Sequence, residues 1–142
     1  MRIAEVSRQA GVGVETVRFY ESRGLIRRPP RPATGGYREY SEDTVRRIRF
    51  VRRAQRLGFS LSGIIELLEL ETVPGARCID VRERAIAKLA DVETKLERLG
   101  RIKGALEELV RACPGQGPAK RCSILAAIKS GDLHLEATGK EE

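Results

Sequence analysis

The sequence has few aromatic residues and no long apolar run, and these absences narrow the kinds of protein it can encode. Tryptophan is missing and aromatic side chains make up 4% of the 142 residues, so a large core would have to be aliphatic. No run of about 18 apolar residues could cross a bilayer, and the first residues lack the apolar segment of a signal peptide. We therefore expect a cytoplasmic protein with no membrane partner.

Cysteine is also scarce, with three residues in the chain: Cys78, Cys113 and Cys122. An odd number of cysteines in a reducing compartment argues against a framework of disulfide bonds. Two of them enclose the short segment CPGQGPAKRC, which is rich in glycine and proline. The thiols are therefore expected either to pack as small buried side chains or to bind a metal ion.

Positive charge is concentrated in the first 60 residues. This segment contains 14 arginines, no lysine and 6 acidic residues, whereas the remainder of the chain is nearly balanced. The planar guanidinium group of arginine matches phosphate oxygens and the edge of guanine. A basic surface can serve solubility alone, but this asymmetry favours contact with nucleic acid.

Two short helices are predicted at the start of the chain. Apolar residues over 3–10 recur with helical spacing up to Gly11, and a second helix is predicted over 14–23, before Gly24. Two helices joined by a tight turn are typical of a helix-turn-helix, whose second helix enters the major groove of DNA. A plain helical hairpin has the same spacing and stays an alternative.

The second helix is expected to divide its side chains between a core and a DNA-facing surface. Val14 and Val17 are predicted to face inward, with Leu25 packing just beyond the helix. The residues predicted to face solvent or DNA are Thr16, Arg18 and Tyr20. Arg18 is the best candidate for contact with a base edge or a phosphate.

The segment IRRPPRPATGGYREY follows and is predicted to form a wing. Its prolines exclude a helix, and a Gly-Gly pair marks a turn before a short strand over 37–40. Such a ribbon beside a helix-turn-helix can lie along the DNA backbone, where Tyr37 and Arg38 offer a hydroxyl group and a charge to phosphates. Tyr40 is expected to pack against neighbouring elements instead.

A second pair of helices follows the wing. Ser41 is predicted to cap an arginine-rich helix that ends at Gly58, and Ser60 is predicted to cap a helix over 61–70. The apolar stripe of the arginine-rich helix consists of Val45, Ile48 and Val51.

The longest periodic stretch runs over 80–112. Its apolar side chains alternate at spacings of four and three, with Lys103 filling one position, which is typical of a coiled-coil seam. The seam consists of Ala85, Leu89, Val92, Leu96, Leu99, Leu106 and Val110. A helix of about 33 residues is about 50 Å long, too long for so small a domain to cover, so we expect a homodimer. Periodicity alone leaves the two helices either parallel or antiparallel.

Three motifs occur in order along the chain: TVRFYESRGLI at 16–26, GYREY at 36–40 and LGFSL at 57–61. Together they resemble the MerR family of transcriptional regulators. The resemblance extends to about residue 130, and the sequence departs from the family pattern at Gly63 and in its proline-rich wing.

The resemblance implies a mainly α-helical protein. It would have a winged helix-turn-helix DNA-binding domain, a long dimerisation helix in an antiparallel coiled coil, and a C-terminal metal-binding loop. The expected boundaries are 1–72 for the DNA-binding domain, 73–79 for a linker, 80–112 for the dimerisation helix, 113–130 for the metal-binding loop and short helix, and 131–142 for a tail.

In an antiparallel dimer, the start of one long helix lies beside the end of the other. Cys78 of one subunit would then meet Cys113 and Cys122 of the other, giving three thiolates, which select soft metal ions. Within the family, copper-type sensors lack a cysteine at the start of the helix, and zinc-type sensors add donors to the loop. The pattern therefore favours Hg(II) as the inducer, with Pb(II), Cd(II) and Zn(II) as alternatives. His134, the only histidine, is expected to be exposed rather than a ligand.

The resemblance also implies a mode of action. A homodimer would occupy a palindromic operator in double-stranded promoter DNA with or without metal, and the metal-bound form would distort the DNA so that RNA polymerase can use the promoter. A drug-binding regulator would normally need a further C-terminal domain. A cysteine-dependent detoxification enzyme would need a base or a cofactor site near a thiol. The sequence shows neither a general base nor a cofactor motif near a cysteine, so we do not expect an enzyme.

Overall fold

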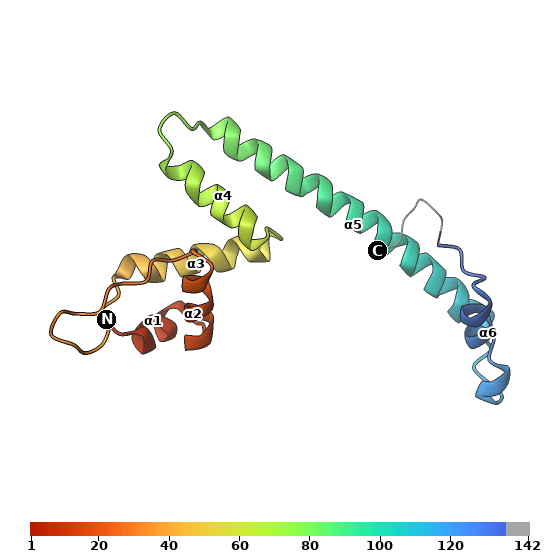
Figure 1. Ribbon diagram of the computed structural model, residues 1–142. Helices are drawn as coiled ribbons and strands as arrows, with labels where there is room; N and C mark the ends of the chain where they lie inside the picture. Colours follow the sequence, from red (N-terminus) through yellow and green to blue (C-terminus); the bar gives the residue numbers. More distant parts are fainter. Residues whose placement is uncertain (136–142) are drawn as a thin grey trace. The chain divides into compact units, whose positions relative to one another are not determined.

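The computed structural model describes residues 1–135, which form six α-helices and one 3-10 helix and contain no β-strand (Figure 1). The chain divides into two compact units, residues 1–88 and the residues from 89 onward, and each is described separately. The mainly helical fold predicted from the sequence is confirmed.

The first unit contains four complete helices and the beginning of a fifth. They are α1 (Ile3–Ala10), α2 (Val14–Ser22), α3 (Glu42–Arg56), α4 (Leu61–Thr72) and the first turns of α5 (Cys78–Ala112). α1 packs against α2 and α3, and α3 packs against α4. The largest fully buried side chains are Leu25, Ile48, Ile64, Val6, Val17 and Val51. The inward positions predicted for Val17 and Leu25 are confirmed, and Val14 is half-buried.

Glycine and serine mark the helix ends that the sequence predicts. Gly11 lies in the left-handed region at φ 74°, and its N–H group bonds back to carbonyl groups in the last turn of α1. At the start of α4, the Ser60 hydroxyl oxygen accepts a hydrogen bond of 3.1 Å from the Gly63 N–H group, which caps the helix. Ser41 occupies the N-cap position of α3 through its backbone alone.

The segment between α2 and α3 differs from the sequence-based expectation. The sequence predicts a short strand over 37–40, but no strand forms anywhere in residues 1–135, so this prediction is wrong. The prolines in the opposing arm lack the N–H groups that a two-stranded ladder requires. The segment is held by a few separate hydrogen bonds instead, among them a reciprocal pair between the backbone groups of Met1 and Tyr40. The Tyr40 N–H group donates to the Met1 carbonyl at 2.7 Å, and Arg38 Nε donates to the Pro29 carbonyl at 2.7 Å.

α5 has 35 residues and begins at Cys78 rather than at residue 80, so Cys78 is the first residue of the helix and not part of the linker. Six predicted seam positions carry large apolar side chains that are exposed in the single chain: Leu89, Val92, Leu96, Leu99, Leu106 and Val110. Within the described part of the chain, no helix is long and apolar enough to cross a membrane.

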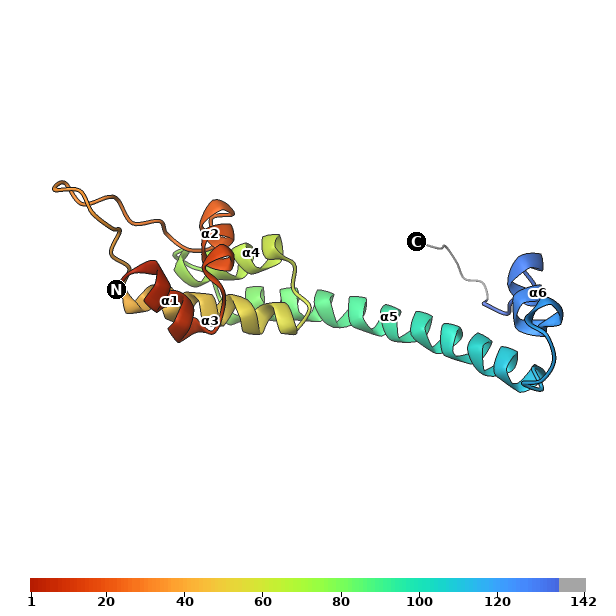
Figure 2. The ribbon, with the colours of Figure 1, turned by 90° about the horizontal axis from the view of Figure 1, so that it is seen from below.

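The second unit contains the remainder of α5, a 3-10 helix (η1, Ala119–Arg121) and α6 (Ser123–Ser130). Figure 2 shows these elements in a view turned by 90° from Figure 1. Ala105 is the only hydrophobic residue buried in the described part of this unit. His134 is exposed, as predicted, and its Nδ1 atom lies 2.7 Å from Glu108 Oε1 on α5. The predicted tail over 131–142 lies outside the described residues from position 136 onward.

Candidate nucleic-acid interface and cysteine loop

α2 carries the side chains that the sequence predicts to meet DNA. Its inward face is fixed by Val17, which is fully buried in the core of the first unit. Arg18, the next residue, is exposed as predicted, whereas Thr16 is half-buried. The helix therefore presents a guanidinium group to solvent from a backbone that is anchored on its other side.

Tyr20 does not face solvent, contrary to the prediction. Its side chain is 2% exposed and belongs to the core, and its hydroxyl group donates a hydrogen bond of 2.8 Å to Gln55 Oε1 on α3. The physical reason is helical spacing, because Tyr20 lies three residues after Val17 and therefore on the same inward face. Tyr20 holds α2 against α3 and is not part of the surface that could meet DNA.

Tyr37 and Arg38 lie in the segment between α2 and α3. The Tyr37 side chain is 68% exposed, and the guanidinium carbon of Arg2 lies 4.2 Å from the centroid of its ring, a cation–π contact. Arg38 is half-buried, and its bond to the Pro29 carbonyl uses one of its five N–H donors. Contacts within the unit therefore orient both predicted side chains.

An open groove of about 640 Å³ on the first unit, which we call the arginine groove, brings three of the predicted residues together. It is lined by Arg18, Tyr37 and Arg38 and by further arginines that sequence reasoning missed: Arg2, Arg28 and Arg31. The arginine count of the first 60 residues signalled a basic surface but could not select these positions. Guanidinium groups that converge on one groove favour a ligand with several phosphates.

One acidic residue, Glu21, also lines the arginine groove. Its Oε2 atom accepts a hydrogen bond of 2.6 Å from the hydroxyl group of Tyr40, which is 6% exposed and packs against the core as predicted. Burial, reinforced by the Glu21 carboxylate, raises the pKa of Tyr40 to about 12. The hydroxyl group therefore stays protonated at neutral pH and keeps its hydrogen bond to the Glu21 carboxylate.

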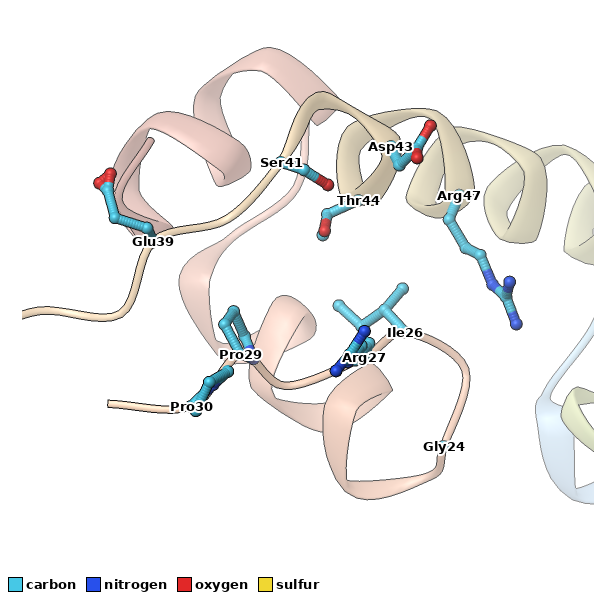
Figure 3. Close-up of a pocket in the computed structure, with 10 residues that line it drawn as sticks. All are labelled: Gly24, Ile26, Arg27, Pro29, Pro30, Glu39, Ser41, Asp43, Thr44 and Arg47. Carbon is cyan, nitrogen blue, oxygen red and sulfur yellow. The ribbon is translucent and has the colours of Figure 1, made fainter. Parts of the chain in front are cut away.

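A second groove on the same unit has mixed charge. Figure 3 shows it between the start of α3 and the segment that follows α2, and its lining includes Arg27 and Arg47 as well as Glu39 and Asp43. Arg47 Nε donates a hydrogen bond of 2.9 Å to the Leu25 carbonyl and so joins α3 to that segment. Because charges of both signs line it, this groove favours an anion less than the arginine groove does.

Cys113 and Cys122 lie close together in the second unit. Cys113 directly follows α5, and Cys122 occupies the N-cap position of α6. The Cys113 side chain lies near enough to Cys122 to lower the pKa of its thiol, and the Gly115 N–H group donates to Cys113 Sγ at 3.4 Å. The glycine- and proline-rich loop therefore turns back and joins the cysteines that enclose it.

The start of α6 favours the charged form of Cys122. The backbone N–H groups of Leu125 and Ile124 are the main causes that lower the pKa of this thiol, and the Cys113 side chain lowers it further. Backbone N–H groups at a helix N-terminus stabilise an anion in this way. Because the thiolate is the form that binds metal ions, the loop suits a soft cation.

Cys78 lies at the other end of α5 from Cys113 and is exposed. A single chain therefore does not gather the three predicted ligands. Among residues 1–135 there is no group of three or more Cys, His, Asp or Glu side chains placed to hold a metal ion. A three-thiolate site would require a second subunit.

Comparison with known proteins assigns the chain to a family. The model of the MerR HTH family regulatory proteins matches residues 1–71, and the model described as MerR, DNA binding, matches residues 45–109. The mercuric resistance operon regulatory protein of Pseudomonas fluorescens is 43% identical over 131 residues, which cover 92% of this chain and 89% of that protein.

Two solved structures resemble this one over nearly their whole length. The transcription regulator PbrR691 from Ralstonia metallidurans CH34 in complex with lead(II) superimposes with a TM-score of 0.79 and 36% identity, covering 90% of this chain and 98% of that one. The regulator MerR from Bacillus megaterium MB1 in complex with mercury(II) gives a TM-score of 0.68 and 36% identity, covering 91% and 99%. The helix-turn-helix, the long helix and the sequence motifs agree with both comparisons, and the chain belongs to the MerR family of helix-turn-helix transcriptional regulators.

Proposed function

We propose that this chain is a transcriptional activator and repressor that binds double-stranded promoter DNA as a homodimer and responds to Hg(II). The observation that carries the proposal is the placement of the cysteines. Two neighbouring cysteines, Cys113 and Cys122, follow one end of α5, and the third cysteine is the first residue at its other end. Two subunits with antiparallel helices would complete one site at each end of the dimer.

The arginine groove supports contact with the DNA backbone. Its guanidinium groups match phosphate oxygens, and most protein–DNA hydrogen bonds go to phosphates and sugars. Arg18 is exposed on α2, the second helix of the helix-turn-helix, so it is our candidate for contact with a base edge. Tyr37 and Arg38 would fix the position of each subunit on its half of a palindromic operator.

The exposed seam of α5 supports the homodimer. Leu96 and Leu99 are 62% and 61% exposed in the single chain, and a long apolar stripe of this kind marks an interaction surface. A second α5 with the same heptad pattern would cover it. An antiparallel pairing is the one that brings Cys78 of one subunit beside the cysteine loop of the other.

The donor atoms fit a soft metal ion. Three thiolates suit Hg(II), Pb(II) or Cd(II), whereas tetrahedral Zn(II) would need a further donor. The relative named as a mercuric resistance regulator supports Hg(II). The lead(II)-bound neighbour has the same identity to this chain as the mercury(II)-bound one, which makes Pb(II) the second candidate. A bound ion would supply a cross-link between subunits, because its ligands come from both.

Activation would then depend on the shape of the promoter. If both forms of the dimer occupy the operator, the metal can act only by favouring one of two arrangements of the DNA-binding units. DNA untwisted or bent by that arrangement would become a substrate for RNA polymerase. The related proteins are regulators, and we assign this chain no catalytic residue.

A metal titration with subunit complementation tests the proposal. Reduced protein is titrated with Hg(II), Pb(II), Cd(II) and Zn(II) while thiolate-to-metal absorption is followed. Cys78→Ser homodimers and Cys113→Ser/Cys122→Ser homodimers should each lose tight binding. Heterodimers made from the two variants should regain one site per dimer, because one Cys78 again meets an intact loop.

The complementation separates the possible outcomes. Restored binding in the heterodimer requires a site shared between subunits, since neither subunit has all three cysteines. Tight binding that persists in Cys78→Ser would contradict the three-thiolate site. If the protein bound Pb(II) in preference to Hg(II), the three-thiolate site would stand and Pb(II) would be the inducer.

A further inference from the structure

The first turns of α5 contact the rest of the first unit through two basic side chains. Arg84 Nη1 lies 2.8 Å from Glu66 Oε1 on α4, and each of these side chains is 49% exposed. The Lys88 ammonium lies 5.8 Å from the centroid of the Phe59 ring. Because Arg84 and Lys88 are four residues apart, they share one face of α5. This face points at α4 and at the turn that precedes it.

The aliphatic stem of Lys88 passes beside the turn between α3 and α4. A Cβ atom built on Gly58 would lie 3.6 Å from Lys88 Cδ, so the stem runs over the backbone of this glycine. Gly58 has φ +96°, a conformation that side chains other than glycine rarely adopt. The turn thus offers a flat backbone surface on which the lysine stem lies, with the ammonium above Phe59.

This turn is continuous with the core and with α2. Phe59 packs against the buried cluster, and the Gly58 N–H group bonds to the Gln55 carbonyl at 2.9 Å. The Gln55 side chain in turn accepts the hydrogen bond from the Tyr20 hydroxyl on α2. A displacement of the start of α5 would therefore act on the same residues that position α2.

We propose that Arg84 and Lys88 form a coupling clamp, which transmits metal binding at Cys78 to the DNA-binding helices. This inference rests on the proposed function. Arg84 follows Cys78 by six residues, about 9 Å along the helix, so a ligand that fixes Cys78 also fixes the clamp. A half-exposed ion pair adds little to stability, so the contacts matter for the orientation of α5 on the first unit. Arg84 and Lys88 are positioning residues and touch neither metal nor DNA.

The experiment uses the full-length dimer on a promoter duplex that the wild-type protein has selected from random-sequence DNA. The duplex carries 2-aminopurine at the centre of the dyad, so that its fluorescence reports distortion when Hg(II) is added. We expect Arg84→Ala and Lys88→Ala each to reduce the Hg(II)-dependent signal change about two- to fivefold, with the double variant reduced further. Affinity for the metal-free operator and for Hg(II) should change less than twofold.

A charge exchange and a matched control sharpen the test. Arg84→Glu should lose the response, and Arg84→Glu/Glu66→Arg should regain it, because the ion pair is rebuilt with its partners exchanged. Arg82→Ala removes the same charge from an exposed position two residues away and should respond like the wild type. A full response in the double alanine variant, or no rescue by the exchanged pair, would overturn the clamp.

A second measurement does not depend on metal or DNA. In the free dimer, amide hydrogen exchange over residues 56–66 should be faster in Arg84→Ala/Lys88→Ala than in wild type, because α4 and the turn before it lose their contacts with α5. Unchanged exchange in that segment would also overturn the clamp. If wild-type protein bound neither operator nor Hg(II) but this change in exchange were present, the contact would stand and the proposed function would fail.

Discussion

The two units of the chain differ in how much apolar surface they bury by themselves. In residues 1–88, side chains such as Leu25, Ile48 and Ile64 are 0% exposed and pack into one cluster. From residue 89 onward, Leu96 and Leu106 are 62% and 54% exposed. The first unit therefore carries a complete core, whereas the second carries one half of an interface. A chain with this division is expected to depend on dimerisation for sensing but not for folding its DNA-binding part.

A charge placed in the seam of α5 should have the largest effect, because it should weaken the dimer while leaving the core of the first unit intact. Leu96→Glu would bury one carboxylate per subunit in the dimer interface, at about 1–3 kcal/mol each. Two such costs should raise the dimer dissociation constant by roughly 30-fold or more, as measured by sedimentation equilibrium. The first unit should keep its helical circular dichroism, because Leu96 is not part of its core.

The neighbouring residue supplies the control for that variant. Lys95→Glu introduces the same side chain one position away, outside the predicted seam, and should leave the dimer nearly unchanged. Equal dissociation of the two variants would contradict the assigned seam, and a stable Leu96→Glu dimer would contradict an interface along this face of α5.

Substitutions of Tyr20, which is buried, and Tyr37, which is exposed, should separate effects on stability from effects on DNA binding. Tyr20→Ala should lower the free energy of unfolding by about 3–4 kcal/mol, because it removes a buried ring. Tyr20→Phe should cost about 1 kcal/mol, the value of the hydrogen bond to Gln55. Urea denaturation of the full-length protein measures both.

Tyr37→Ala is the matched variant at an exposed position. It should leave stability within about 0.5 kcal/mol of wild type while weakening operator binding several-fold, as followed by fluorescence anisotropy. If Tyr37→Ala destabilised the protein as much as Tyr20→Ala, the distinction between the two rings would be lost.

The smallest expected effect concerns the acidity of Cys122. The lowered pKa of its thiol in the folded protein means that the thiolate persists to lower pH than in the unfolded chain. The stabilisation linked to this shift is present above the unfolded pKa and is lost as pH falls through the folded one. Peptide-resolved alkylation of the metal-free protein by iodoacetamide should therefore show a lower midpoint for Cys122 in buffer than in urea. If the midpoints in buffer and in urea were the same, the start of α6 would not stabilise the Cys122 thiolate.

The sequence predicted the helices more reliably than the orientation of individual side chains. Gly11 and Ser60 mark helix ends in the structure because the left-handed glycine and the capping hydroxyl are local interactions. Tyr20 was assigned to the surface although its spacing from Val17 places it in the core. Its hydroxyl group finds an acceptor on α3, thirty-five residues away in sequence, and no local pattern encodes that contact.

The residues that converge in space were the hardest to predict. Arg2 comes to the arginine groove by stacking on Tyr37, a contact that no local pattern encodes. The strand predicted over 37–40 failed because pairing depends on the opposite arm, where prolines cannot donate. The assembly of Cys78 with the cysteine loop stays a prediction, since it depends on a second chain.

Every residue of the buried cluster described above comes from positions 6 to 68, and none comes from the cysteine loop. The loop can therefore be redesigned with little effect on the folding of the DNA-binding part. Exchanging residues 113–122 for loops with other donor sets would be expected to yield reporters of different metals that read the same promoter. Under the proposed function, this separation would let the metal that is sensed be changed while the recognised promoter stays the same.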